Sequence, residues 1–313
     1  MVDISRFVLW GQAWQLAQAA PFTGGGLGAF PALYSTYIHA IPFYLLAHAH
    51  NSYLNLLVEQ GWTGLAAYGM VLASSAWVAT RALARPSGPN RALLVGGAAG
   101  LAVVAFQGLG DATLVATRFI PFLLVPAGLV VAAGPASQAQ RRPAAWPWAL
   151  AAGLILLAGL WVYRPAQAAW RANLGVVLTN RVLLAEWPTG QFSEGRAKGA
   201  LAGAVRHFEA ALRLQPDQFT AHYYLGLQRL AERDFEAAGE HLAQAYAVTP
   251  THRGVVKTLG FTYVWAGRFA DARPLLQQIP EARHELEVYA WWWAERQRAD
   301  LSANATHMLA LLP

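Results

Sequence analysis

Four side chains near the start of the sequence have the chemistry to move a proton and to hold an anion. His48 and His50 lie two residues apart, and Glu59 follows nine residues after His50. The charge of an imidazole changes near neutral pH, so His50 suits the role of a general base. Arg6 is always charged and donates paired hydrogen bonds to phosphate oxygens, so it suits an anionic leaving group. These residue types favour a transfer in which a base takes an acceptor proton while a cation steadies developing negative charge.

A glycine-rich stretch, Gly24–Gly28, lies between Arg6 and the histidines. Glycine lets the backbone approach a ligand closely, and successive N–H groups can bind an anion. We therefore expect Gly26 and Gly28 to contact substrate, with a flexible turn as the structural alternative. The stretch has no following Lys-Ser or Lys-Thr, which excludes a nucleotide-binding P-loop.

The surroundings of the histidines leave several roles open. Residues His50–Gln60 are predicted to be helical, so Glu59 faces a side similar to that of His50. Glu59 is a candidate for substrate binding that either orients a partner or only caps the entry to the membrane. His48 either makes supporting hydrogen bonds at the substrate site or has no role, and Asn51 is expected to contact substrate. A zinc site formed by His48, His50 and Glu59 is disfavoured, because residues two apart do not share a helix face. A Ser-His-Asp hydrolase is excluded because there is no nucleophile elbow, and no metal or cofactor is expected.

The distribution of charge divides the sequence into two parts. Residues 1–163 contain ten Asp, Glu, Lys and Arg side chains, and residues 164–313 contain thirty. The charge-poor part includes four apolar runs that are each long enough to span a membrane. These runs are Gln60–Thr80, Ala92–Gly110, Phe119–Gln140 and Pro143–Tyr163. We therefore expect an all-α protein in which polytopic membrane helices precede a soluble α-solenoid.

The loops between the apolar runs predict an orientation in a bacterial inner membrane. Arginines gather between the first two runs and between the last two, namely Arg81, Arg85, Arg91, Arg141 and Arg142. Arginine-rich loops mark the cytoplasmic side, so the segments before residue 60 and after residue 163 are expected in the periplasm. Arg6 has a structural alternative, because a long basic side chain can also extend to the membrane surface.

Four regions are expected along the chain. From the N-terminus they are a periplasmic catalytic loop region with short helices at 1–62, the transmembrane helices at 63–163, about four in total, a helical connector at 164–199 and a repeat domain at 200–313. In the first region, Arg6–Ala20 is predicted to be a helix. Prolines and glycines interrupt Pro21–His48, which is predicted to be an irregular loop near the membrane surface.

The second part of the sequence repeats with a period of 34 residues. The matching pairs are Phe208/Leu242, Ala211/Ala245, Pro216/Pro250, Leu225/Leu259, Gly226/Gly260, Phe235/Phe269, Ala238/Ala272 and Leu242/Leu276. This period, with small residues where helices cross, is typical of tetratricopeptide repeats. We expect repeats at Gln218–Pro250 and Thr251–Pro280, after a half-repeat at Ala200–Pro216 and before a degenerate pair around Trp291–Trp293. The repeats are expected to bind an acceptor, a glycan or a protein partner.

Composition excludes several other classes of protein. The sequence has no cysteine, so disulfides, thiolate metal sites and cysteine nucleophiles are excluded. Residues 164–313 contain sixteen basic and fourteen acidic side chains, which gives no support for binding nucleic acid.

The histidine motif resembles the O-antigen ligase superfamily of bacterial membrane enzymes. That family has a His-Asn pair, nine residues, a Gly, two residues and another small residue, which correspond to His50-Asn51, Gly61 and Gly64. Upstream, the family has an Arg-initiated helix with an aromatic residue, then Pro and a glycine-rich turn that ends in an aromatic residue. The residues that match these features, and a downstream Gly-Asp pair, are Arg6, Trp10, Pro21, Gly24–Gly28, Phe30 and Gly110-Asp111. The resemblance covers residues 1 to about 165.

The resemblance implies a metal-independent, inverting transfer of a preassembled glycan from undecaprenyl pyrophosphate. It assigns His50 as the essential histidine and Arg6 as a donor-binding arginine. The acceptor is lipid A core in a ligase, another repeat unit in a polymerase, or a protein side chain, and the motif does not separate these. Many members have Leu at the position of Trp10, and members usually have more membrane helices before this region. We therefore expect the chain to be the C-terminal part of a longer enzyme.

Two other functions were weighed against glycan transfer. One is a non-catalytic membrane scaffold whose repeats recruit partners in envelope assembly, since stacked repeats form extended binding surfaces. The other is a transporter subunit, which is disfavoured because no series of charges within the apolar runs marks a pathway.

Overall fold

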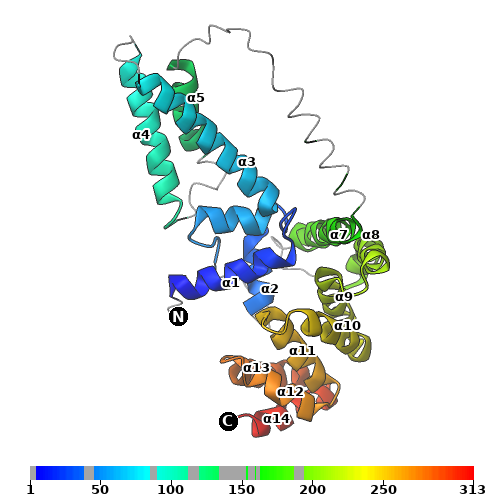
Figure 1. The fold of residues 1–313 in the computed structure, drawn as a ribbon. Helices are drawn as coiled ribbons and strands as arrows, with labels where there is room; N and C mark the ends of the chain where they lie inside the picture. The colour runs from blue at the N-terminus through cyan, green and yellow to red at the C-terminus, as the bar shows by residue number, and fades with distance from the viewer. Residues whose placement is uncertain are drawn as a thin grey trace. The chain divides into compact units, whose positions relative to one another are not determined.

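The computed structural model of the chain describes residues 5–38, 46–84, 90–111, 120–133, 153, 159, 163–186 and 194–313. In this part of the chain all regular structure is helical (Figure 1), which confirms the predicted all-α class. The chain divides into two compact units. The first contains Met1–Phe30 and Leu46–Tyr163, and the second contains Pro31–Leu45 and Arg164–Pro313.

Three helices of the first unit pack around a small apolar core. They are α3 (Ser52–Leu83), α4 (Arg91–Gln107) and α5 (Ile120–Ala133). Helix α1 (Arg6–Ala19) matches the helix predicted at Arg6–Ala20 and packs against α3. The buried residues that α3, α4 and α5 share are Ala79, Leu101, Ala127 and Val130.

Helix α3 is interrupted at Gly61. This glycine has φ 65° and ψ −166°, which no α-helix contains. The chain after α1 crosses α3 at this point, because the Trp62 N–H donates to the Pro21 carbonyl at 2.7 Å. The interruption divides α3 at the boundary predicted between a short helix and the first apolar run. The predicted start at His50 was wrong, however, because α3 begins at Ser52.

The four predicted membrane spans are not confirmed. Among the described residues, no helix combines the length and the apolar character needed to cross a membrane. Helices α4 and α5 have 17 and 14 residues, fewer than the roughly 20 that a span requires. The fourth apolar run, Pro143–Tyr163, lies almost entirely outside the described residues.

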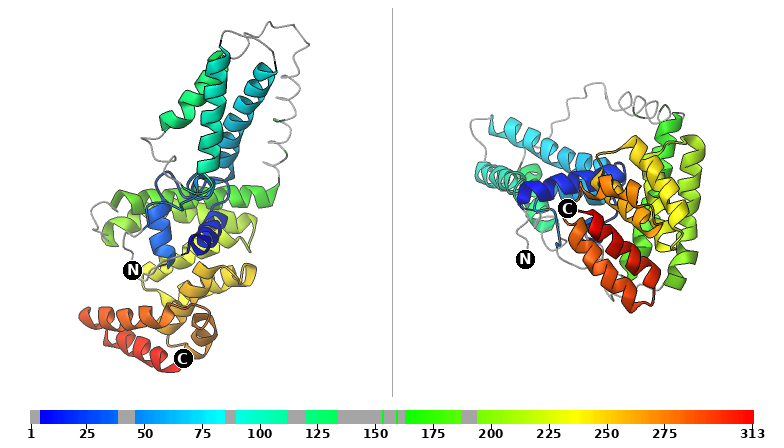
Figure 2. Two further views of the ribbon diagram at one scale, coloured as in Figure 1. Left: turned by 90° about the vertical axis from the view of Figure 1, so that its left-hand side faces the viewer. Right: turned by 90° about the horizontal axis from the view of Figure 1, so that it is seen from below.

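The second unit is a stack of helix pairs, together with one helix from earlier in the sequence. The pairs are α7 (Arg164–Glu186) with α8 (Glu194–Leu214), α9 (Phe219–Ala231) with α10 (Phe235–Val248), α11 (Arg253–Trp265) with α12 (Phe269–Leu276), and α13 (Ala282–Glu295) with α14 (Ala299–Leu311). Successive pairs also contact each other through α8 with α9 and α10 with α11 (Figure 2). The predicted repeats coincide with the second and third pairs, and the predicted degenerate pair coincides with the fourth. The earlier helix is α2 (Phe30–Ile38), so the prediction of an irregular loop over Pro21–His48 was wrong for these residues.

Glycines allow the paired helices to cross closely. A Cβ on Gly226 would lie 2.6 Å from Leu242 Cγ, and a Cβ on Gly260 would lie 2.7 Å from Leu276 Cδ2. These are the residues that the 34-residue period aligned, so the predicted role of small residues at the crossings is confirmed. Gly175 makes the same approach to Phe208 in the first pair, at 2.5 Å. Gly175 does not lie a multiple of 34 residues from Gly226 and Gly260. The repeat period therefore did not reveal α7 and α8 as a helix pair, and they were predicted as a connector and a half-repeat.

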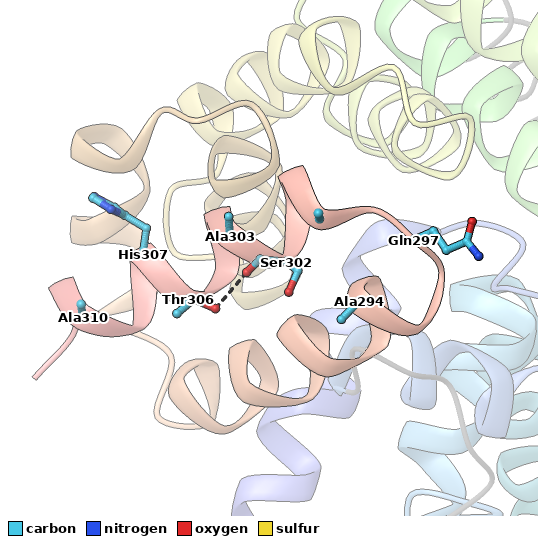
Figure 3. A pocket seen from close by; sticks show the side chains of 8 residues that line it. Ala294, Gln297, Ser302, Ala303, Thr306, His307 and Ala310 are labelled. Carbon is cyan, nitrogen blue, oxygen red and sulfur yellow. Dashed lines mark hydrogen bonds between the residues drawn. The ribbon is translucent and has the colours of Figure 1, made fainter.

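The last pair carries an open hollow with a cavity volume of about 840 Å³. Small side chains line most of it, including Ala294 on α13 and Ala303 and Ala310 on α14 (Figure 3). His307 stands at its edge, where its ring lies 4.4 Å from the ring of Phe269. The hollow is therefore a shallow, smooth face of the repeat unit.

Replacement of Gly61 by Ala is expected to destabilise the first unit. A Cβ at this position would lie 2.4 Å from the Phe22 carbonyl oxygen and would be held at a positive φ, at a cost of roughly 2 kcal/mol or more. The measurement is the thermal unfolding midpoint of the purified chain. Gly11→Ala is the matched control, because Gly11 lies in α1 and an added Cβ meets nothing within 4 Å. Equal midpoints for the two variants would contradict the close crossing at Gly61.

Candidate functional site

The histidine motif lies in a short non-helical segment immediately before α3. His50 adopts a positive φ of 49°, and Asn51 forms the N-cap of α3 with an extended backbone. The rings of His48 and His50 lie 4.4 Å apart in an edge-to-face arrangement. The two histidines therefore face one another, and the argument that residues two apart diverge on a helix was wrong because this segment is not helical.

Hydrogen bonds attach the end of α4 and the residues after it to the first turn of α3, and the Tyr53 hydroxyl donates one of them to the Ala105 carbonyl at 2.8 Å. The Ser52 N–H donates to the Gly108 carbonyl at 2.8 Å, and the Asn51 side-chain amide donates to the Leu109 carbonyl at 3.0 Å. The Ser52 hydroxyl donates to the carbonyl of Asp111 at 2.9 Å. These bonds fix residues 108–111 beside the histidine motif.

This attachment places a carboxylate next to the candidate base. Asp111 Oδ1 lies 3.7 Å from His50 Nδ1, and both side chains are a little over one-third exposed. A carboxylate at this distance from a ring nitrogen can fix the orientation of the imidazole. Asp111 matched the family only as part of a Gly-Asp pair, and sequence spacing gave no signal that it would meet His50.

Arg6 reaches the same loop from α1. Its Nη1 donates to the Gly110 carbonyl at 3.3 Å, one residue before Asp111, and its side chain is exposed. The structure therefore gathers Arg6, Asp111 and His50 around residues 110 and 111. This arrangement offers a cation, a carboxylate and an imidazole to a ligand on one surface of the first unit.

His48 is held in a less polar setting than the other members of the cluster. Its Nδ1 is buried and has no hydrogen-bond partner among the described residues. Burial, with a smaller contribution from His50, lowers the pKa of His48, and Asp111 opposes this shift. His48 therefore stays neutral when the pH is near 7, and it adds no positive charge beside His50.

The same cluster has the composition of a metal site. Ligand atoms of His48, His50 and Asp111 all lie within 4.8 Å of one another. Two imidazoles and one carboxylate are a common ligand set for divalent metals. Glu59 is not among these residues, so the zinc site weighed from the sequence does not form as described there.

Asn51 has its polar groups committed within the fold. Its Oδ1 accepts from the N–H groups of Tyr53 and Leu54, each at 3.0 Å, and its amide donates to Leu109. The residue is only 8% exposed. Asn51 therefore positions the histidine segment, and a direct contact of its side chain with substrate stays a prediction.

The glycine-rich turn is also committed within the fold. The N–H of Gly25 donates to the Val58 carbonyl at 2.7 Å, and the N–H of Gly26 donates to the Glu59 carbonyl at 2.9 Å. The N–H of Gly28 donates to the Glu59 carboxyl. The expectation that Gly26 and Gly28 present free N–H groups to a ligand is therefore corrected, because α3 accepts these hydrogen bonds.

Glu59 connects α3 to the glycine turn. It is 6% exposed, and its Oε1 accepts from the Phe30 N–H at 3.4 Å. Burial raises the pKa of Glu59, although hydrogen bonds from Gly28, Phe30 and Asn55 oppose the shift. The prediction that Glu59 faces the side of His50 was wrong, because that prediction required His50 to lie in the same helix.

Glu59→Ala is expected to lower the free energy of unfolding by about 1–3 kcal/mol, because it leaves buried N–H groups without an acceptor. Glu59→Gln keeps an acceptor and cannot ionise, so it is the matched control.

Since the pKa of Glu59 is raised on folding, its carboxyl stabilises the fold most at acid pH and less as the pH rises. Unfolding experiments from acid to neutral pH should therefore show the Gln variant gaining stability relative to wild type. An Ala variant as stable as wild type would rule out this anchoring role.

Comparisons with known families agree with the two-part organisation. Residues 3–69 match the family model described as O-Antigen ligase, a range that includes Arg6, the glycine turn, the histidine motif and Glu59. Residues 229–290 match the family model described as Tetratricopeptide repeat. No curated protein and no solved structure matches the chain. The chain is therefore similar to the O-antigen ligase family over residues 3–69 and to tetratricopeptide repeats over residues 229–290.

Proposed function

We propose that the chain acts in a glycan transfer of the O-antigen ligase type, in which a glycan leaves undecaprenyl pyrophosphate and joins a hydroxyl acceptor. The observation that carries this proposal is the gathering of Arg6, His50 and Asp111 around residues 110 and 111. The match of residues 3–69 supports a role in glycan transfer for envelope polysaccharide at a general level. The acceptor is a lipid, a glycan or a protein.

Each of the three side chains has a distinct part in the proposed reaction. His50 takes the proton of the acceptor hydroxyl as the acceptor oxygen bonds to the anomeric carbon. The bond from that carbon to the phosphate oxygen breaks, and its electron pair leaves with the pyrophosphate. Arg6 stabilises this leaving anion, and Asp111 stabilises the imidazolium of His50. Attack from the face opposite the leaving group inverts the anomeric centre.

The surface of the α3, α4 and α5 bundle supports a membrane location for this reaction. Large apolar side chains on these helices stay exposed, as in Met70, Trp77, Val103, Phe106, Leu124 and Val131. Gly97 lets α4 approach α5, since a Cβ there would lie 2.9 Å from the Pro126 carbonyl oxygen, and small residues at crossings are typical of membrane helices. We propose that lipids cover this surface in a bacterial inner membrane, with the repeats in the periplasm.

His50→Ala is expected to lower the rate of glycan transfer by roughly 10²–10⁴-fold, because the acceptor proton loses its base. The assay follows glycan transfer to the acceptor in membranes that contain the chain, with its expression level measured in parallel. His284→Ala is the control, since this histidine is 81% exposed on α13 in the second unit. Transfer that persists in the His50→Ala variant would favour a scaffold whose repeats recruit other proteins.

Removal of divalent cations with EDTA is expected to leave the transfer rate unchanged. The proposed reaction uses the positive charge of Arg6 and the imidazole of His50, and the resemblance to the ligases implies no metal. A loss of transfer that added Zn²⁺, Mn²⁺ or Mg²⁺ restores would instead assign His48, His50 and Asp111 as metal ligands. The same measurement on wild type and on Asp111→Asn distinguishes a metal at this cluster from a metal elsewhere.

A further inference from the structure

The repeat unit includes a helix from far earlier in the sequence. Pro31–Leu45 groups with Arg164–Pro313 in the second unit, and within that unit α2 lies beside α11 (Figure 1). Helix α2 has nine residues, fewer than an isolated helix needs to be stable in water. Contacts outside the helix are therefore needed to keep α2 folded.

Tyr34 is one of the buried side chains of α2. Only 1% of its surface is exposed, and Ala32 on the same helix is 7% exposed. The segment that contains Tyr34 was predicted to lie near the membrane surface, where a tyrosine keeps its hydroxyl end in water, and the burial of Tyr34 does not fit that position. The environment of Tyr34 is instead that of a packed contact within the second unit.

The neighbouring face of the repeats carries a row of paired charges, which we name the charged seam. It consists of Arg253 and Lys257 on α11, with Glu281 and Glu285 at the start of α13. Arg253 Nη2 pairs with the Glu281 carboxylate, and Lys257 Nζ lies 2.6 Å from Glu285 Oε1. The side chains of Lys257 and Glu285 are 5% and 9% exposed. Charges that are buried to this degree require partners, so the seam is held in one arrangement.

The seam is chemically complementary to a tyrosine hydroxyl. Burial raises the pKa of Tyr34 to about 12, while Arg253 lowers it and Glu281 raises it further. The hydroxyl is thus protonated at neutral pH, and it can donate to a carboxylate and accept from a guanidinium. Arg253 Nε is buried and has no hydrogen-bond partner among the described residues. Tyrosine has an apolar ring and a polar hydroxyl at its end, so it fits the charged seam better than Leu or Phe, which have no polar group.

We propose that the charged seam is a docking site within the chain, that its occupant is helix α2, and that Tyr34 is the anchor. By this contact the repeats bind a helix that lies far earlier in the sequence. The tetratricopeptide region then has a partner in its own chain, in addition to any acceptor or protein that it recruits. A ligand that covers the seam would have to displace α2.

Photocrosslinking tests this docking in the full chain. A p-benzoylphenylalanine at position 34 keeps an aromatic ring at the anchor and reacts with what it touches under ultraviolet light. Mass spectrometry is expected to find crosslinks to α11 or to the first half of α13, within residues 253–289. The same probe at position 7 is the control, because Phe7 on α1 is 80% exposed. Crosslinks from position 34 only to lipid, to detergent or to residues outside the repeats would overturn the proposal.

Hydrogen exchange provides a second test that needs no bulky probe. Tyr34→Ala is expected to speed exchange of the α2 amides by about tenfold or more, because α2 loses its anchor and opens locally. Tyr34→Phe should fall between this variant and wild type, since it keeps the ring and removes the hydroxyl. Leu33→Ala is the control on the same helix, because Leu33 is only half-buried. Equal exchange rates for the Tyr34→Ala and Leu33→Ala variants would also overturn the proposal.

Discussion

The attachment of residues 108–111 to the first turn of α3 is the interaction on which the candidate site depends. Asn51 and Ser52 provide it, by capping the helix and by binding the carbonyls of Gly108, Leu109 and Asp111. Each such hydrogen bond contributes only about 0.5–1.5 kcal/mol, but together they fix the place of a carboxylate that lies some sixty residues away in sequence. Without them, His50 would have a neighbouring histidine and no counter-ion. The helix cap thus serves the chemistry as well as the helix.

A second constraint determines where the cation lies. The chain that follows α1 crosses α3 at Gly24 and Gly61, where an added Cβ would lie within 2.5 Å of backbone atoms. Glu59 secures the crossing by accepting hydrogen bonds from the far side of the glycine turn. Because α1 is held against α3 in this way, Arg6 at its first residue meets the Gly110 carbonyl. The glycines therefore act on the site indirectly, by positioning the helix that carries the arginine.

Local patterns in the sequence predicted the features that depend on local structure. The helix at Arg6, the boundary near Gly61 and the 34-residue register of Gly226 and Gly260 all follow from breakers, apolar runs and repeat spacing. The features that these patterns did not predict depend on contacts between residues far apart in the sequence. Asp111 lies beside His50 because Asn51 and Ser52 bind the backbone carbonyls of residues 108–111. The N–H groups of the glycine turn donate hydrogen bonds to α3 because α3 passes beside them. The predicted start of the helix at His50 was wrong for a local reason. Asn51 is the better N-cap, so the helix begins at Ser52 and His50 lies before it.

The charges of the cluster explain why two histidines can stand side by side in a site that must accept a proton. At the effective dielectric constant of about 20 that is typical near a protein surface, unit charges about 4 Å apart interact by about 4 kcal/mol, and exposure reduces this value. Asp111 Oδ1 lies 3.7 Å from His50 Nδ1, so a carboxylate stands within this range of His50. Burial lowers the pKa of His48 and keeps that residue neutral. The two imidazoles are therefore not equivalent, since His50 lies beside a carboxylate and His48 has a buried Nδ1, and this difference supports the proposal of His50 as the base.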